Sequence, residues 1–370
     1  MAAPIKVLIA DDSSLMRTLL SDLLTIDGNI QVVGTARDGV AAVEMASQLH
    51  PDVLVMDVQM PRLSGLEALR QIMDRRPMPV VIISGLNNSA FVSQAFQLGA
   101  VDAISKPSGT VSVDLYKIQD ELISKVKTAA QADMRSLLAS TVLPHAVEIP
   151  VPPVFAHAAG DVVRCLVLIA ASTGGPRTLE QLLCVLPPDI PAAILIVQHM
   201  PAEFTRTFAE RLNQKCALPV KEAEEADVLM GGHAYVAPGG YHMLLSGSHE
   251  NGKLAIHLDS SPPVSSLRPR ADLTMTDAVR VFGNRCLGIV LTGMGDDGTA
   301  GLRLIREAGG ATIAQDEATS TIYGMPKAAA ENGAAQLILP IHKIPFEIAR
   351  WCIQWVEEVL PPASIARKTT

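Results

Sequence analysis

Short apolar runs alternate with helical periodicity through most of this chain, and the runs end abruptly on polar residues or glycines. Such alternation is typical of parallel sheets covered by helices, because each parallel connection needs a crossover, usually a helix. We therefore predict an α/β fold built from doubly wound parallel sheets. The strands expected in the first third are Ile5–Ala10, Ile30–Thr35, Val53–Met56, Val80–Ser84 and Ala103–Ser105, and the helices include Leu15–Leu24, Val40–Leu49 and Leu66–Met73.

Charged and hydroxyl side chains follow or end four of these strands. Asp11 and Asp12 follow the first strand, Asp57 the third and Lys106 the fifth, and Ser84 ends the fourth. One polar strand end is ordinary, but five such residues at one sheet edge favour a site. Carboxylates gathered in this way suit Mg²⁺, and Asp57 could act as a nucleophile toward a phosphoryl group. Ser84 would then bond a phosphate oxygen, and Lys106 would balance its charge.

Composition limits the remaining functions. Across 370 residues, 48% are hydrophobic, 4% are aromatic and the net charge is −8, with no cluster of Lys and Arg. We expect no nucleic-acid partner, because phosphate binding needs basic clusters and single-strand binding needs stacking aromatics. No segment has the length of a membrane span or the pattern of a signal peptide, so we expect a soluble cytoplasmic protein. The five cysteines are predicted to be free thiols, namely Cys165, Cys184, Cys216, Cys286 and Cys352.

A second candidate site begins in the stretch LVLIAASTGGP, residues 166–176. An apolar strand ends there on Ser172, which is followed by Thr173 and two glycines. A serine on a sharp glycine turn between a strand and a helix is a common way to present a nucleophile. The alternative is a helix cap, in which the hydroxyl only satisfies backbone N–H groups. A base and an acid elsewhere must decide between these interpretations.

Candidates for the base and the acid follow two later strands. Strand Ala193–Val197 leads to His199, and strand Leu287–Leu291 leads to adjacent aspartates, Asp296 and Asp297, on a glycine-rich turn. The strand before His199 is the clearest among those near a histidine, although His233 and His242 also lie beside glycines. The pattern alone does not choose between the two aspartates, which are Asp296 and Asp297.

The same turn formally matches a dinucleotide fingerprint. Residues 293–298 read GMGDDG after a strand, and Asp316 follows a further strand, Ala311–Ala314, at the distance of a ribose-binding acid. Two aspartates would, however, repel a pyrophosphate at the helix N-terminus. We therefore do not predict NAD binding.

The motifs of the first third resemble those of response-regulator receiver domains. DD at residues 11–12, MDVQMPRLSG around Asp57, Ser84 and SKP at residues 105–107 all fit that family. The resemblance implies a flavodoxin-like fold, Mg²⁺ held by Asp11, Asp12 and Asp57, and phosphorylation of Asp57 by a partner histidine kinase. Receivers usually have an aromatic switch residue where this chain has Ala103.

The second part of the chain resembles the catalytic domain of the chemotaxis protein-glutamate methylesterases. The resemblance rests on ASTGGP, VQHMP, APGGYHM, LTGMGDDGTAG and the late MP at residues 325–326. It implies a Rossmann-like esterase domain whose catalytic serine, histidine and acid are Ser172, His199 and Asp297. Backbone N–H groups around Thr173 and Met294 are candidates for the oxyanion hole. No metal is expected in this domain.

These resemblances predict a receiver domain at residues 1–128, a Pro-rich linker at 129–162, a methylesterase domain at 163–358 and a C-terminal tail at 359–370. They imply phosphorylation-activated hydrolysis of glutamate methyl esters on methyl-accepting chemoreceptors, together with deamidation of receptor glutamines. Two alternatives stay open from the sequence. One is a receiver-gated hydrolase that acts on another ester, and the other is a non-catalytic docking protein controlled by phosphorylation.

Overall fold

The computed structural model describes residues 3–85, 89–106, 112–139, 163–248 and 253–359. The chain divides into two compact units, Met1–Ala139 and Ser140–Thr370. Pro107, residues 140–162 of the predicted linker and residues 360–370 of the predicted tail lie outside the described residues.

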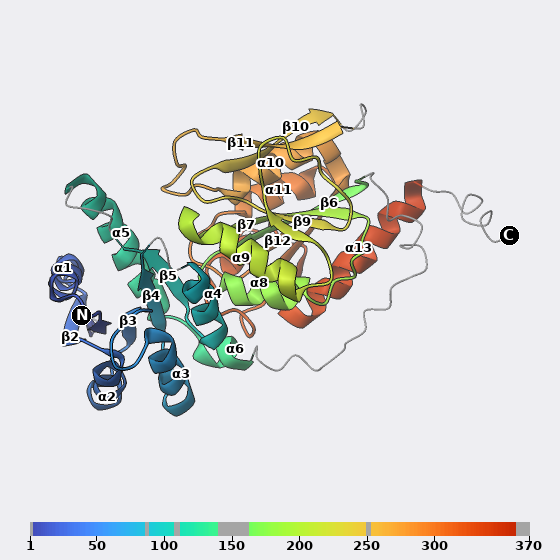
Figure 1. Ribbon diagram of the computed structural model, residues 1–370. Helices are drawn as coiled ribbons and strands as arrows, with labels where there is room; N and C mark the ends of the chain where they lie inside the picture. The colour runs from blue at the N-terminus through green and yellow to red at the C-terminus, as the bar shows by residue number, and fades with distance from the viewer. Residues whose placement is uncertain (1–2, 86–88, 107–111, 140–162, 249–252, 360–370) are drawn as a thin grey trace. The chain divides into compact units, whose positions relative to one another are not determined.

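The first unit contains a five-stranded parallel sheet in the order β2-β1-β3-β4-β5, with helices on both faces (Figure 1). Helix α1 packs against α5, whereas α3 packs against both α2 and α4. The strands are β1 (Ile5–Ala10), β2 (Ile30–Ala36), β3 (Val53–Asp57), β4 (Val80–Ser84) and β5 (Asp102–Ser105). The helices are α1 (Ser14–Thr25), α2 (Gly39–Leu49), α3 (Gly65–Arg75), α4 (Ser89–Leu98), α5 (Ser112–Ala129) and α6 (Met134–Ala139).

Polar caps fix where the first three helices begin. The Ser13 side chain accepts a hydrogen bond from the first turn of α1, and Asp38 does the same for α2. Ser64 and Glu67 form a capping box at the start of α3. Each cap satisfies backbone N–H groups that have no partner within the helix. The loops at the carboxyl edge of the sheet therefore have defined ends.

The first unit extends beyond its last sheet-covering helix. Leu137 of α6 is buried in the same core as Leu122 and Val126 of α5. The compact unit ends at Ala139. The domain bounds inferred from the sequence stay predictions.

The second unit contains a seven-stranded parallel sheet in the order β14-β13-β12-β6-β7-β9-β8. Its strands are β6 (Cys165–Ala171), β7 (Ala192–Gln198), β8 (Val220–Glu222), β9 (His233–Val236), β12 (Cys286–Val290), β13 (Ala311–Gln315) and β14 (Leu337–Leu339). Its helices are α8 (Gly175–Leu183), α9 (Ala202–Lys215), α10 (Ala271–Phe282), α11 (Thr299–Glu307), α12 (Met325–Glu331) and α13 (Ile344–Val359).

The strand order of this sheet reverses between β6 and β12. From β6 the chain adds β7 on one side, and β12 begins the other half of the sheet. Open α/β sheets bind ligands beyond the carboxyl ends of the strands at such a reversal. Every residue of β6, β7 and β12 is buried, because helices cover both faces of the sheet (Figure 1). The two doubly wound parallel sheets predicted from the sequence are confirmed.

An antiparallel hairpin lies outside the parallel sheet. It consists of β10 (His242–Ser248) and β11 (Lys253–Asp259), and β10 packs against α10. The sequence analysis did not predict it, because its strands do not follow the strand–helix alternation.

The prediction of five free cysteines was wrong for one pair. Cys184 and Cys216 form a disulfide in this structure, whereas the other three cysteines are free and buried. Cys184 caps the C-terminus of α8 and Cys216 caps that of α9, and these two helices pack together. The pairing depends on that packing, which their separation along the chain does not reveal.

Candidate active site

Ser172 follows β6 directly and lies on a tight turn into α8. Its backbone N–H donates to the Thr292 carbonyl at 3.0 Å, and its carbonyl accepts from the Gly175 N–H at 2.7 Å. Gly174, the N-cap of α8, has a φ of 78°. A side chain would be strained in this left-handed conformation, so glycine suits the turn. Position 293 also requires glycine, because an added Cβ would lie 2.6 Å from the Ser172 Cβ.

Gln198 ties this turn to the next strand. Its Nε2 donates to the Ser172 carbonyl at 2.9 Å and to the His199 carbonyl at 3.0 Å. The His199 N–H in turn donates to the Ala171 carbonyl at 3.0 Å. The backbones that carry the candidate nucleophile and base are thus bonded to one buried amide. Gln198 carries no signal in the sequence beyond its place at the end of a strand.

Asp297, and not Asp296, contacts His199. The Nε2 of His199 lies 2.8 Å from the Asp297 Oδ2, and the Asp297 side chain is 1% exposed. The Asp297 carboxylate also accepts hydrogen bonds from the N–H groups of Ala271, Asp272 and Gly298 at 2.8, 3.0 and 3.0 Å. Asp296 is exposed on the same turn. Of the two adjacent aspartates, the structure thus joins Asp297 to His199.

The hydrogen bonds keep Asp297 ionised. Burial by itself would raise the pKa of Asp297. The hydrogen bond and charge of His199, with the N–H groups of Ala271 and Asp272, instead hold that pKa below its ordinary value. The site therefore contains a permanent carboxylate beside the imidazole.

The other candidate histidines have different partners. His233 Nδ1 lies 3.0 Å from the Gly231 carbonyl, and His242 Nε2 lies 3.4 Å from the Pro262 carbonyl. Among the described residues, neither is hydrogen-bonded to Asp297. Of the three histidines considered, His199 is thus the one that the structure joins to an acid.

The oxyanion candidates flank the serine. Thr173 follows Ser172 and is 4% exposed, whereas Met294 is 48% exposed. Met294 follows Gly293, whose backbone lies against the Ser172 side chain. The turns after β6 and β12 therefore meet at Ser172.

The N–H groups that a dinucleotide would need at the GMGDDG turn have a partner within the protein. The N–H groups of Gly298 and Gly301, at the start of α11, both donate to Asp272 Oδ1 at 2.9 Å. A pyrophosphate would need these donors. Asp316 Oδ1 accepts from the Thr319 N–H and hydroxyl at 3.0 and 2.6 Å, which stabilises a local turn.

The first unit brings its predicted residues together as well. The Lys106 ammonium lies 2.7 Å from Oδ2 of both Asp11 and Asp57. The carboxylates of Asp11, Asp12 and Asp57 offer oxygens within 4.8 Å of one another, which fits the hard oxygen ligands of Mg²⁺. Among the described residues the buried Ser84 hydroxyl has no hydrogen-bond partner, so it is available to a ligand.

Charge compensation in this first site is incomplete. Burial raises the pKa of Asp57 above its ordinary value, although Lys106 opposes the shift. Burial lowers the pKa of Lys106, but its contacts with Asp11 and Asp57 outweigh burial and raise it. Ala103, at the usual aromatic position, is buried, and Lys125 Nζ donates to its carbonyl at 2.6 Å.

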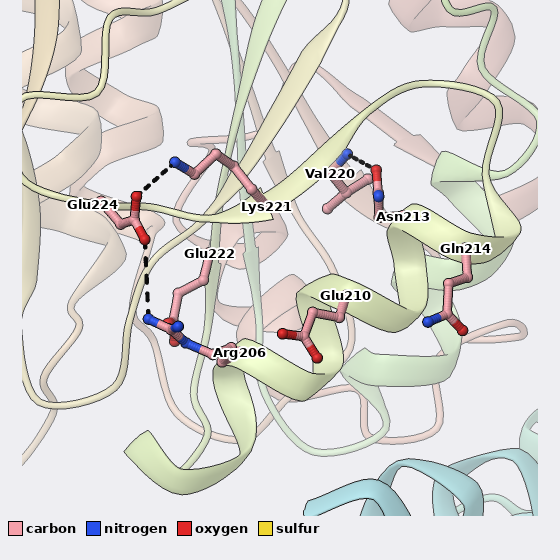
Figure 2. A pocket seen from close by; sticks show the side chains of 8 residues that line it. All are labelled: Arg206, Glu210, Asn213, Gln214, Val220, Lys221, Glu222 and Glu224. Carbon is pink, nitrogen blue, oxygen red and sulfur yellow. Dashed lines mark hydrogen bonds and ion pairs between the residues drawn. The ribbon is translucent and has the colours of Figure 1, made fainter.

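A surface pocket of the second unit lies apart from these catalytic candidates. It is lined by residues of α9 and β8 with neighbouring loops, and none of Ser172, His199 and Asp297 contributes to it (Figure 2). Its cations pair with its own acids: Lys221 lies 3.0 Å from Glu224, and Arg206 3.2 Å from Glu222. No helix among the described residues has both the length and the apolar character required to cross a bilayer.

Comparison with known proteins agrees with this geometry. Residues 7–114 match the response regulator receiver domain family, and residues 167–348 match the CheB methylesterase family. A protein-glutamate methylesterase/protein-glutamine glutaminase of Pyrococcus horikoshii is 45% identical over 95% of this chain and 94% of its own length. Proteins with the same name from Symbiobacterium thermophilum and Geobacillus kaustophilus are 45% and 43% identical. These matches cover 94% and 92% of this chain, and 97% and 96% of the relatives. The chain therefore belongs to the protein-glutamate methylesterase/protein-glutamine glutaminase family, and it is a hydrolase that joins a response regulator receiver domain to a CheB methylesterase domain.

Proposed function

We propose that this protein hydrolyses glutamate methyl esters on methyl-accepting chemoreceptors in the cytoplasm, with Ser172 as its nucleophile. The observation that carries the proposal is the convergence of the Ser172 turn with the hydrogen-bonded pair of His199 and Asp297 at the strand-order reversal. The names of the relatives support glutamate methyl esters of a protein as the substrate, and also deamidation of protein glutamines. Both reactions follow the same attack, with methanol or ammonia as the leaving group.

In the proposed mechanism the two imidazole nitrogens of His199 have different tasks. With its proton on Nε2, His199 donates a hydrogen bond to Asp297, which leaves Nδ1 to accept the proton of the Ser172 hydroxyl. The serine oxygen then attacks the ester carbonyl, and the imidazolium returns the proton to the departing methoxide. Asp297 holds the ring and stabilises its cation. Water attacks the acyl-enzyme by the same route and releases the glutamate carboxylate.

Backbone N–H groups of Thr173 and Met294 are proposed to bind the oxyanion of the tetrahedral intermediate. They lie on the two turns that meet at Ser172. One such donor typically contributes about 3 kcal/mol to the stability of the transition state.

The receiver domain is proposed to activate the esterase when a histidine kinase of the chemotaxis pathway phosphorylates Asp57. Mg²⁺ held by Asp11, Asp12 and Asp57 would neutralise charge on the transferring phosphoryl group. Lys106 is placed to pair with the phosphoryl group, and the Ser84 hydroxyl is placed to bond one of its oxygens. Activation requires that the phosphorylated receiver affect the esterase differently from the unphosphorylated one.

Release of labelled methanol from methylated chemoreceptors tests the serine mechanism. Ser172→Ala is expected to lower kcat by about 10⁴–10⁶-fold, because the residual rate then comes from binding and the oxyanion hole alone. Ser246→Ala, on the exposed part of β10, is the matched control and should keep wild-type activity. Phosphorylation of Asp57 by a small phosphodonor should be intact in both variants. A Ser172→Ala rate within tenfold of wild type would refute the mechanism.

A further inference from the structure

A second buried carboxylate lies directly behind the proposed catalytic acid. Asp272, in the first turn of α10, is 8% exposed. Its Oδ1 accepts from the N–H groups of Gly298 and Gly301 at 2.9 Å each, and its Oδ2 accepts from Arg270 Nη2 at 2.8 Å. The sequence analysis did not select it, because an acid in the first turn of a helix is common.

Asp272 and Asp297 cap each other's helices. Asp297 precedes α11 and accepts the N–H groups of Ala271 and Asp272 at the start of α10. Asp272 belongs to α10 and accepts the N–H groups of Gly298 and Gly301 at the start of α11. Each carboxylate thus satisfies N–H groups that otherwise lack partners within their helix. A shift of either helix start would move the Asp297 carboxylate relative to His199.

Arg270 lies between the two carboxylates. Its Nη2 contacts Asp272, and its Nε lies 3.5 Å from Asp297 Oδ1. Its side chain is only 13% exposed, so solvent screens these charges weakly. The charged or titratable side chains in this contact network are Arg270, Asp272, Asp297 and His199.

The surroundings of Asp272 and Asp297 shift the pKa values of these two acids in opposite directions. Burial raises the pKa of Asp272, and the charge of Asp297 adds to that shift, whereas the Gly301 N–H and Arg270 oppose it. The contacts of Asp297 hold its pKa below the ordinary value. The negative charge of Asp272 engages Arg270 and so limits how strongly that cation neutralises Asp297.

We propose that Asp272, together with Arg270, is a positioning residue for the hydrolase reaction, because it fixes the place and the effective charge of the Asp297 carboxylate that orients His199. The inference depends on the proposed role of Asp297 in the Ser172 mechanism. Asp272 itself need not touch the substrate.

The same helix offers a control with a purely structural environment. Asp277 also accepts a backbone N–H, from Leu245 at 2.6 Å, and also pairs with an arginine, Arg280 at 2.8 Å. Its side chain is 18% exposed, against 11% for Asp272. Its contacts hold β10 rather than the turn that carries Asp297.

The experiment compares Asp272→Asn with Asp277→Asn in the full-length protein, using methanol release from methylated receptors. Asp272→Asn is expected to lower kcat by about 10–100-fold with KM within about twofold, since small misplacements of catalytic groups cost rates of this order. It should also move the ascending limb of the pH profile of kcat/KM to lower pH. Without Asp272 the charge of Arg270 acts fully on Asp297, so the imidazolium loses stabilisation. Asp277→Asn should change neither quantity.

Arg270→Lys and Arg270→Gln provide a second pair of variants, should Asp272→Asn fail to fold. The lysine variant keeps the charge and should retain more of kcat than the glutamine variant. Equal kcat values and pH limbs in Asp272→Asn and Asp277→Asn, or in the two Arg270 variants, would overturn the positioning role. Asp297→Asn is measured beside them. If it is inactive while Asp272→Asn is normal, only the present inference fails, whereas an active Asp297→Asn refutes the proposed triad.

Discussion

The two units place carboxylates at the carboxyl edges of similar parallel sheets, but they compensate the charge in different ways. In the first unit a single side chain, Lys106, pairs with both Asp11 and Asp57. In the second unit Asp297 is held by backbone N–H groups from two helix starts and by His199. We expect an added cation to take over the role of Lys106 in the first arrangement, whereas in the second the contacts lower the pKa of Asp297 and favour its anion. The difference suits one edge to a metal and a phosphoryl group, and the other to proton transfer.

The largest expected effect tests the fixed anion. Asp297→Asn should lower kcat for methanol release by about 10⁴-fold, because an amide favours the wrong imidazole tautomer and accepts fewer N–H groups. Asp296→Asn, on the exposed part of the same turn, should change kcat little. Equal losses of kcat in the two variants, or a larger loss in Asp296→Asn, would mean that Asp297 is not the catalytic acid.

An intermediate effect tests the replaceable cation of the first unit. Lys106→Met should destabilise this unit by about 2–4 kcal/mol near neutral pH, because it leaves buried carboxylates unpaired. Millimolar Mg²⁺ should recover part of the loss. Hydrogen exchange of the β1 and β3 amides, measured as denaturant is added, gives both the loss of stability and its recovery by Mg²⁺.

The matched control for this prediction is Lys127→Met, which removes a more exposed ion pair with Asp27. Lys127→Met is expected to lower the free energy of unfolding by less than about 1 kcal/mol, and Mg²⁺ should not change that loss. If Lys106→Met is no more destabilising than this control, or if Mg²⁺ gives it no recovery, the contrast between the two edges does not hold.

The smallest expected effect is a pH dependence that separates the two edges. The pKa of Asp57 is raised by burial, so Asp57 takes up a proton at higher pH than an ordinary aspartate does. Protons then compete with Mg²⁺, and the affinity for Mg²⁺ should fall by up to about tenfold per pH unit as the solution is acidified through that range. Calorimetric titration of the intact protein with Mg²⁺, from neutral pH down to the ordinary pKa of aspartate, measures the change, and a constant affinity over that range would contradict the prediction.

The Asp297 site of the second unit should also lose its contribution on acidification, but at lower pH. The pKa of Asp297 is lowered in the folded state, so its contribution to stability is present above the ordinary aspartate pKa. That contribution is lost only as the pH falls through the lowered value. Loss of Mg²⁺ affinity at the first edge should therefore begin at higher pH than acid loss of the Asp297 contribution.

Much of the fold follows from local patterns. The predicted strands Ile5–Ala10 and Val80–Ser84 have the observed bounds, and Ala193–Val197 differs from β7 by one residue at each end. These bounds could be predicted because an apolar run marks a buried strand and a polar residue marks its end. The hairpin of β10 and β11 was not predicted, because these two strands are joined without a helix and so fall outside the alternation of strands and helices.

The sequence by itself determined two α/β units with polar residues at their strand ends, because strand burial and helix caps depend on neighbouring residues. The strand pattern left Asp296 and Asp297 both open, although the family resemblance implied Asp297. The sequence did not pair Cys184 with Cys216 or reveal Asp272 beside Asp297. These features depend on which turns meet and where each side chain points within its turn. Strand order and the packing of α10 against α11 decide the contacts of Asp297 and Asp272, and the packing of α8 against α9 decides the cysteine pair, through contacts between residues distant in the chain. Only the tertiary structure contains those contacts.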